Sequence, residues 1–161
     1  MSNFRLDAPY DENIVYNFHC YDPLIFTHQG AGWVDKMDLD FRISVDSTYG
    51  EMAKASEEQT NGIGGDLKLL DPNEKLSSAY FDKCFAEAVA VAEERNVPLY
   101  CGEYGVIECA SAEDTLKWYE MISSSFNKYN IGRAAWSYRE MNFGLTAPEL
   151  DSVRDKLIKL L

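Results

Sequence analysis

One carboxylate stands out among the residues of this chain that could do chemistry. Glu103 lies near the end of an apolar stretch, residues 98–104, between a glycine and a tyrosine. Burying a carboxylate at such a place is costly unless it is paired, so the position indicates either a functional role or a structural salt bridge. His19 and Tyr21 lie near the end of an earlier apolar run, and Trp136 lies in a later one. These three residues are further candidates.

Three short apolar runs carry the candidates. Residues 14–21 are rich in β-branched and aromatic residues and end at Asp22-Pro23, which is typical of a strand that runs into a turn. Residues 98–104 begin with a proline, which a strand tolerates at its first position. Residues 133–138 form the third run. The sequence therefore predicts three strands.

Helical patterns separate these strands. Residues 77–96 place apolar side chains every three or four positions, the spacing of a helix that packs on a core. Residues 24–76 are irregular apart from a short helix that we expect over 48–59. One long helix and a long excursion are thus predicted between the first two strands.

Capping patterns predict two more helices. Ser111 followed by Asp114 resembles a capping box and predicts a helix that ends before Gly132. Thr146 and Glu149 predict the start of a last helix with an apolar stripe. Each strand is therefore followed by a predicted helix.

This order of elements predicts an α/β fold. Strands joined through helices run parallel, and a parallel sheet needs helices on its faces. Active sites of such folds lie at the carboxyl ends of the strands, where all three ends can direct side chains into one pocket. Side-chain alternation is expected to place these pairs on a common face: His19 with Tyr21, Cys101 with Glu103, and Ala134 with Trp136.

Composition excludes several classes of function. The chain has 161 residues, 46% of them hydrophobic, which is enough for one domain with a core. Its 27 acidic and 15 basic residues give a net charge of −12, which argues against nucleic acids and anionic membranes as partners. Residues 1–9 lack the pattern of a signal peptide, and no apolar run is long enough to span a membrane. We expect a soluble chain that carries no targeting signal.

Metal ligands and disulfides are not expected. The four cysteines form no C-x-x-C pair and are interpreted mostly as buried thiols. The two histidines belong to no zinc-binding pattern. No metal or other cofactor is therefore expected.

Three segments carry recognisable motifs. They read YNFHCYDP at 16–23 with FTHQGA at 26–31, PLYCGEYGV at 98–106, and AAWSY at 134–138 with NFGL at 142–145. In this order they resemble the sixth, seventh and eighth strands of glycoside hydrolase family 5, the cellulase family. Three motifs in the right order are far more specific than any one of them, and they span nearly the whole chain.

The resemblance implies retaining hydrolysis of a β-linked glucan or related polysaccharide. In that mechanism two carboxyl groups lie about 5 to 5.5 Å apart, one as nucleophile and one as general acid/base. Glu103 matches the nucleophile, Tyr21 the residue that orients it by a hydrogen bond, and His19 a residue that lines the site. His28, in the same stretch, is interpreted as structural.

The resemblance also assigns three aromatic residues to substrate binding. Trp136 matches a flat platform for a pyranose ring, whereas Trp33 and Phe143 match loop positions over the cleft. Structural interpretations stay open, because Trp33 and Phe143 could pack only their own loops. His19, Tyr21 and Trp136 could be ordinary strand-end residues.

The chain departs from the family in its extent. A (β/α)8 TIM barrel needs about 250 residues, and the resemblance covers only the last three βα units. The Asn-Glu-Pro motif that carries the general acid/base in this family is absent, since Asn73-Glu74 is followed by Lys75. Residues 1–161 are therefore expected to form a single partial TIM-barrel domain that is inactive as an isolated chain.

Two classes of function stay open. The first is a cellulase-like glycoside hydrolase that acts within a complete barrel. The second is a non-catalytic remnant or glycan-binding module that holds sugars by stacking. Because a partial sheet leaves open edges, we expect self-association or association with a missing N-terminal barrel half. Family members are commonly secreted, so the localisation of this chain is left open.

Overall fold

The computed structural model describes residues 8–139 and 141–161. At its centre is a sheet of three strands, β1 (Tyr16–Cys20), β2 (Leu99–Tyr104) and β3 (Gly132–Arg133). Their order in the sheet is β1-β2-β3, and both pairs run parallel. The three strands therefore present their carboxyl ends at the same end of the sheet, as the α/β prediction requires.

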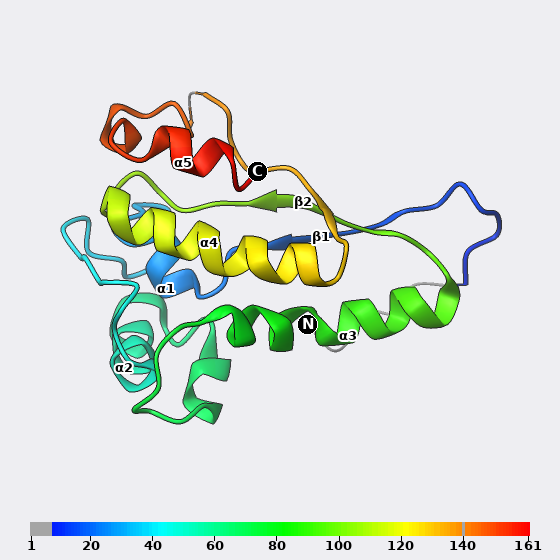
Figure 1. The fold of residues 1–161 in the computed structure, drawn as a ribbon. Helices are drawn as coiled ribbons and strands as arrows, with labels where there is room; N and C mark the ends of the chain where they lie inside the picture. Colours follow the sequence, from blue (N-terminus) through cyan, green and yellow to red (C-terminus); the bar gives the residue numbers. More distant parts are fainter. Residues whose placement is uncertain (1–7, 140) are drawn as a thin grey trace.

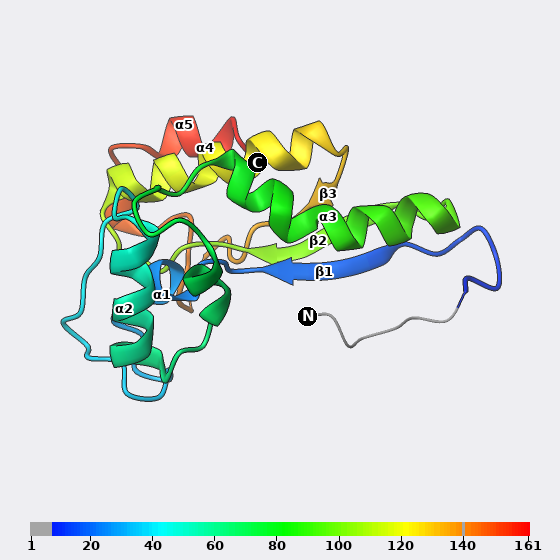
Figure 2. The ribbon, with the colours of Figure 1, turned by 90° about the horizontal axis from the view of Figure 1, so that it is seen from below.

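Two long helices lie on one side of this sheet (Figures 1 and 2). α3 (Ser78–Arg95) precedes β2, and α4 (Ala112–Lys128) connects β2 to β3. The rings of Phe85 on α3 and Phe126 on α4 are stacked with centroids 5.1 Å apart. Their buried faces and the covered face of the sheet pack in one hydrophobic core, which also includes side chains from residues 25–76 and 150–157.

A long excursion separates β1 from α3. Its irregular part is held by Gln29, which is almost fully buried. The Gln29 amide donates a hydrogen bond to the carbonyl of Phe26 and accepts one from the backbone of Ile43. Because both the nitrogen and the oxygen of this buried amide are hydrogen-bonded, the amide fixes a loop that has no regular secondary structure. The regular elements of the excursion are α1 (Leu24–Thr27), α2 (Tyr49–Thr60) and the 3₁₀ turn η1 (Gly65–Leu69).

The third strand is much shorter than the prediction over residues 133–138. Beyond β3 the chain still follows β2, because the backbone of Ala134 donates to the carbonyl of Cys101. The backbone of Trp136 likewise donates to the carbonyl of Tyr104. The segment runs beside β2 through separate hydrogen bonds, without a continuous ladder.

The last predicted helix is divided in two. A 3₁₀ turn, η2 (Pro148–Leu150), precedes α5 (Arg154–Ile158), and no side-chain hydrogen bond caps either element. The prediction that Thr146 and Glu149 form a cap is therefore wrong. The backbone of Thr146 instead donates to the carbonyl of Tyr138, which belongs to the preceding loop.

Half of the predicted capping box forms at α4. The hydroxyl of Ser111 accepts a hydrogen bond from the backbone of Asp114 at 3.1 Å. The carboxylate of Asp114 accepts one from the backbone of Val45 at 3.3 Å. Asp114 thus ties the excursion to the start of α4, a contact that local sequence cannot reveal.

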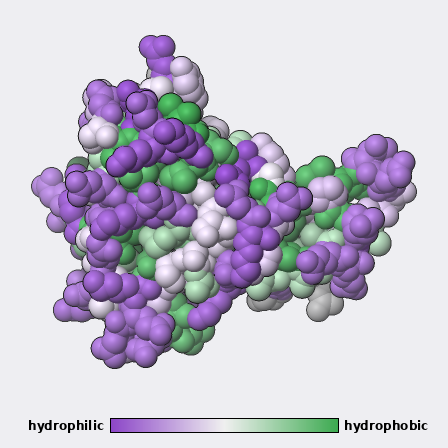
Figure 3. Space-filling model, viewed as in Figure 1, coloured by the Kyte–Doolittle hydropathy of each residue, from purple (hydrophilic) through white to green (hydrophobic). Residues whose placement is uncertain are grey.

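One face of the molecular surface is mainly hydrophilic (Figure 3). Hydrophilic residues predominate on the face seen in Figure 3, with smaller hydrophobic patches between them. Within the described residues, no helix is long and apolar enough to cross a membrane. The four cysteines are free thiols, and Cys20 and Cys101 are buried.

Candidate active site

The carboxyl ends of β1 and β2 bring three of the predicted site residues into contact. The hydroxyl of Tyr21 donates a hydrogen bond to Oε2 of Glu103 at 3.0 Å. Nδ1 of His19 lies 3.5 Å from the same oxygen. The Glu103 side chain is 33% exposed, so its carboxylate is partly shielded and still open to a ligand.

A shift in strand register places Glu103 on the uncovered face of the sheet. Phe18 pairs with Cys101, and both pack in the core. The next residue, His19, pairs with Glu103, so Gly102 has no partner. A shift of one residue reverses the face that each following side chain takes. The expectation that Cys101 and Glu103 share a face is therefore wrong.

At this end of the sheet, two glycines allow other parts of the chain to approach the backbone of β2 and the loop after it closely. A Cβ on Gly102 would lie 2.6 Å from Oδ1 of Asn17. A Cβ on Gly105 would collide with the backbone oxygen of Trp136. Because a backbone atom cannot move aside as a side chain does, Gly105 allows Trp136 to lie beside β2. The Trp136 side chain is exposed enough to offer its ring to a ligand.

Four aromatic rings cluster next to Glu103. The Phe143 ring lies 5.4 Å from that of Tyr21 and 5.0 Å from that of His28, measured between centroids. The Trp33 ring lies 6.3 Å from those of His28 and Phe143. Phe143 is 6% exposed and Trp33 is 56% exposed. Phe143 therefore packs inside the cluster, whereas Trp33 leaves its ring open.

A second carboxylate, Glu108, holds the loop of Phe143. Its Oε2 accepts a hydrogen bond from the backbone of Phe143 at 2.8 Å, and the Phe143 carbonyl accepts one from Ser137. Phe143 adopts φ 72, a left-handed conformation that costs a non-glycine residue roughly 1–2 kcal/mol. Sequence reasoning missed Glu108, because a loop carboxylate outside any motif gives no signal before its partner is known.

Burial sets the protonation of the groups around Glu103. Burial, and then the hydrogen bond to Glu103, raise the pKa of Tyr21, so its hydroxyl stays protonated and donates. Burial lowers the pKa of His28 to about 4, so its ring is neutral at pH 7. Burial raises the pKa of the Cys101 thiol to about 12, which makes it a poor nucleophile.

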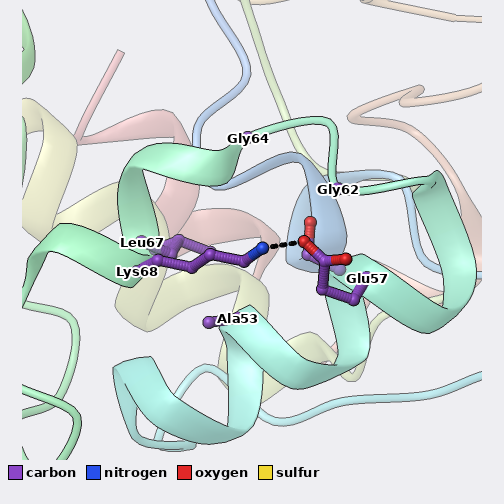
Figure 4. A pocket seen from close by; sticks show the side chains of 7 residues that line it. Ala53, Glu57, Gly62, Gly64, Leu67 and Lys68 are labelled. Carbon is purple, nitrogen blue, oxygen red and sulfur yellow. Dashed lines mark hydrogen bonds and ion pairs between the residues drawn. The ribbon is translucent and has the colours of Figure 1, made fainter.

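The described residues outside this site include a shallow hollow but no cluster of metal ligands. Among residues 8–139 and 141–161, no group of three His, Cys, Asp or Glu side chains could hold a metal ion. A shallow hollow between α2 and η1 is lined in part by the ion pair of Lys68 with Glu57 (Figure 4). None of its lining residues belongs to the strand ends. They are Ala53, Ser56, Glu57, Gly62, Gly64, Leu67 and Lys68.

Comparison with known proteins decides the family. Residues 2–142 match Cellulase (glycosyl hydrolase family 5). The chain belongs to glycosyl hydrolase family 5. This family 5 chain is 38% identical over 97% of its length to Cellodextrinase A of Ruminococcus flavefaciens. It is 33% identical over 94% of its length to Endoglucanase C of Acetivibrio thermocellus. It spans 39% and 43% of these relatives.

Solved structures place the sheet within a larger architecture. The family 5 chain matches an endoglucanase with a TM-score of 0.66 at 20% identity, covering 95% of this chain and 42% of that one. It matches a hyperthermophilic endo-β-1,4-glucanase in complex with substrate with a TM-score of 0.62 at 24% identity, covering 89% and 37%. The three parallel strands and their flanking helices therefore have the fold of a partial (β/α)8 barrel, as the motifs predicted.

Proposed function

We propose that this family 5 chain supplies the nucleophile half of a retaining glycoside hydrolase site that cleaves a β-1,4-glucan or related polysaccharide. The observation that carries the proposal is the convergence of Tyr21 and His19 on one carboxylate at the carboxyl ends of two parallel strands. Glu103 is the proposed nucleophile. Tyr21 orients it, and His19 lines the site.

The contacts suggest which oxygen of Glu103 attacks. The hydrogen bond from Tyr21 and the approach of His19 both involve Oε2. We therefore assign the attack on the anomeric carbon to Oε1. A bond forms between this oxygen and C1 while the glycosidic C1–O bond breaks, and its electron pair leaves with the departing oxygen.

The departing oxygen of a natural glucan also needs a proton. General acid catalysis contributes about 10²–10⁴-fold, and the Asn-Glu-Pro motif of the family is absent from this sequence. We propose that residues 1–161 form one partial barrel domain that does not hydrolyse natural glucans by itself. The acid/base carboxylate would come from a further part of the barrel.

Two tryptophans support a carbohydrate substrate. Trp33 is 56% exposed and Trp136 is 36% exposed, and both come from loops near the carboxyl ends of the strands. Flat exposed rings suit stacking on pyranose faces. Phe143 is buried, so in the proposal it supports the site by packing and contacts sugar little. The names of the relatives, a cellodextrinase and endoglucanases, favour β-1,4-glucans.

The test is covalent labelling of Glu103. The chain is incubated with a 2-deoxy-2-fluoro cellobioside that carries a dinitrophenyl leaving group, and its intact mass is recorded. Dinitrophenolate departs without a proton, so the test does not need the acid/base residue. We expect a mass increase of one fluorocellobiosyl group in the chain and none in Glu103→Gln.

A matched control is Glu120→Gln, because Glu120 is an exposed glutamate in the middle of α4 and does not belong to the strand ends. It should be labelled at the rate of the unaltered chain. Absence of labelling in the unaltered chain would contradict the proposal. Binding of cellotetraose without labelling, measured by calorimetry, would favour the alternative of a glycan-binding module, which the missing acid motif supports.

A further inference from the structure

Tyr21 lies just beyond the end of β1, so the strand ladder does not hold it. Its hydroxyl must nevertheless stay 3.0 Å from Oε2 of Glu103. The residue that holds the Tyr21 backbone is Thr27, at the end of α1. The hydroxyl of Thr27, which is fully buried, donates a hydrogen bond to the carbonyl of Tyr21 at 2.5 Å.

Thr27 also contacts the loop that follows the strand of Glu103. Its own carbonyl accepts a hydrogen bond from the backbone of Ile107 at 3.0 Å. Ile107 follows Glu103 by four residues in the loop after β2. Thr27 therefore links the segment that carries Tyr21 to the segment that carries Glu103.

The next residue, His28, completes this arrangement. Its Nδ1 lies 2.9 Å from Oγ1 of Thr27. The Thr27 hydroxyl has one hydrogen, and both carbonyls within its reach, those of Tyr21 and Pro23, can only accept it. No hydrogen is left for His28, so His28 must donate from Nδ1. The neutral ring at pH 7 then carries its proton on Nδ1 and none on Nε2.

The His28 ring also restrains Tyr21 directly. The two rings meet edge to face with centroids 5.3 Å apart, and Phe143 packs against both. Tyr21 is thus held at its backbone by Thr27 and at its ring by His28. The side chains of Thr27 and His28 make no described hydrogen bond to Glu103, so we expect these side chains to act on the carboxylate through Tyr21.

We infer that Thr27 and His28 are positioning residues that hold the Tyr21 hydroxyl on Glu103, with His28 in the Nδ1–H tautomer. The inference rests on the proposed role of Glu103 as nucleophile. It assigns to His28 a role in positioning Tyr21, whereas the sequence motif alone indicated only a structural role for this histidine.

The first experiment measures the rate of labelling by the fluorocellobioside in matched variants. Thr27→Val removes the hydroxyl at nearly constant volume, and Thr27→Ser retains it. We expect labelling by Thr27→Val to slow about 10–100-fold, since small misplacement of a reacting group has effects of this size. Thr27→Ser should label within about threefold of the unaltered chain.

Variants of His28 separate the hydrogen bond from the bulk of the side chain. Asparagine places an amide near the position of Nδ1, whereas glutamine places it near Nε2. His28→Asn should therefore label faster than His28→Gln. Equal rates for these two variants would contradict a donor role for Nδ1.

A double-mutant cycle tests whether the effect passes through Tyr21. In a Tyr21→Phe background the hydroxyl that contacts Glu103 is gone, so Thr27→Val should cause little further loss of labelling rate. A general structural effect would slow labelling equally in both backgrounds, and that result would overturn the inference.

Two further readouts do not depend on labelling. Imidazole ¹⁵N spectra at pH 7 should show the His28 proton on Nδ1, and a proton on Nε2 would overturn the assigned tautomer. In a chain with ¹³C-labelled tyrosine, Thr27→Val should lower the pKa of Tyr21 toward its ordinary value, whereas Thr27→Ser should not. If the unaltered chain is not labelled, the proposed function fails, and these two measurements still decide the inference.

Discussion

Two side chains from the end of β1 meet one carboxylate oxygen, Oε2 of Glu103. Tyr21 donates a hydrogen bond to it, and His19 lies within 3.5 Å. A hydrogen bond from a neutral phenol orients the carboxylate without neutralising its charge. An adjacent lysine or arginine would neutralise that charge, which a nucleophile needs in order to attack the anomeric carbon. The hydrogen bond from Tyr21 is thus compatible with the proposed role of Glu103 as nucleophile.

Burial of His28 predicts a pH dependence of stability. Its pKa in the folded chain is about 4, below the value of about 6.5 for an unfolded histidine. Between these values the unfolded chain binds more protons, so this residue costs stability as the pH falls from about 7 to 4. The cost reaches about 3 kcal/mol at most.

The measurement is urea unfolding of the unaltered chain and of His28→Asn at pH 7 and at pH 4.5. The free energy of unfolding should fall more steeply with acidification in the unaltered chain, because the variant has no imidazole to titrate. Equal slopes in the two proteins would show that His28 keeps an ordinary pKa. Carboxylates contribute equally to both proteins and cancel in the comparison.

At the scale of elements, the site depends on how β1 and β2 are paired. The register shift opposite His19 turns Glu103 from the core toward the uncovered face. The Trp136 backbone passes close to Gly105, so the segment that follows β3 lies beside the end of β2. Both features arise from contacts between chain segments that are far apart in sequence.

Gly105→Ala tests the second feature. The added methyl would collide with the backbone oxygen of Trp136, so we expect a loss of about 1–3 kcal/mol in the free energy of unfolding. Gly32→Ala is the matched control, since its nearest neighbour is the flexible, exposed side chain of Leu39 at 3.1 Å. The control should change stability by less than about 0.5 kcal/mol. Similar losses in both variants, measured by urea unfolding, would contradict the close-packed role of Gly105.

At the scale of the whole molecule, the described sheet has two open edges. β1 and β3 each pair only with β2 within the described residues, and α3 and α4 lie on one side of the sheet (Figure 2). Two exposed aromatic residues belong to the same sheet region, Tyr100 on β2 and Trp136 in the segment that follows β3. Unpaired strand edges are templates for pairing with another chain.

We therefore predict that the chain self-associates. Sedimentation velocity should show a concentration-dependent increase in mass, and added salt should strengthen it, because the net charge of −12 opposes association. Val15→Lys should weaken it, since Val15 is exposed just before β1 and a lysine there blocks edge pairing. A single monomer at all concentrations would exclude self-association.

Local sequence determined the longer elements and most of the candidate site, but not the length of β3 or the division of the last helix. The apolar period along α3 and α4 and the apolar runs of β1 and β2 are properties of neighbouring residues, so they were predictable and are confirmed. The motifs around Tyr21 and Glu103 indicated the family before any geometry was known. The structure then brings these two residues into contact.

Tertiary structure alone decided the features that depend on distant partners. The strand register determines on which face Glu103 lies, and it depends on how β1 pairs with β2. The hydrogen bond from Phe143 to Glu108 and those that link Thr27 to Tyr21 and Ile107 likewise join separate segments. A local pattern specifies which face of an element is apolar. It does not specify which residue of a neighbouring strand lies opposite, because that choice is made by packing of the whole core.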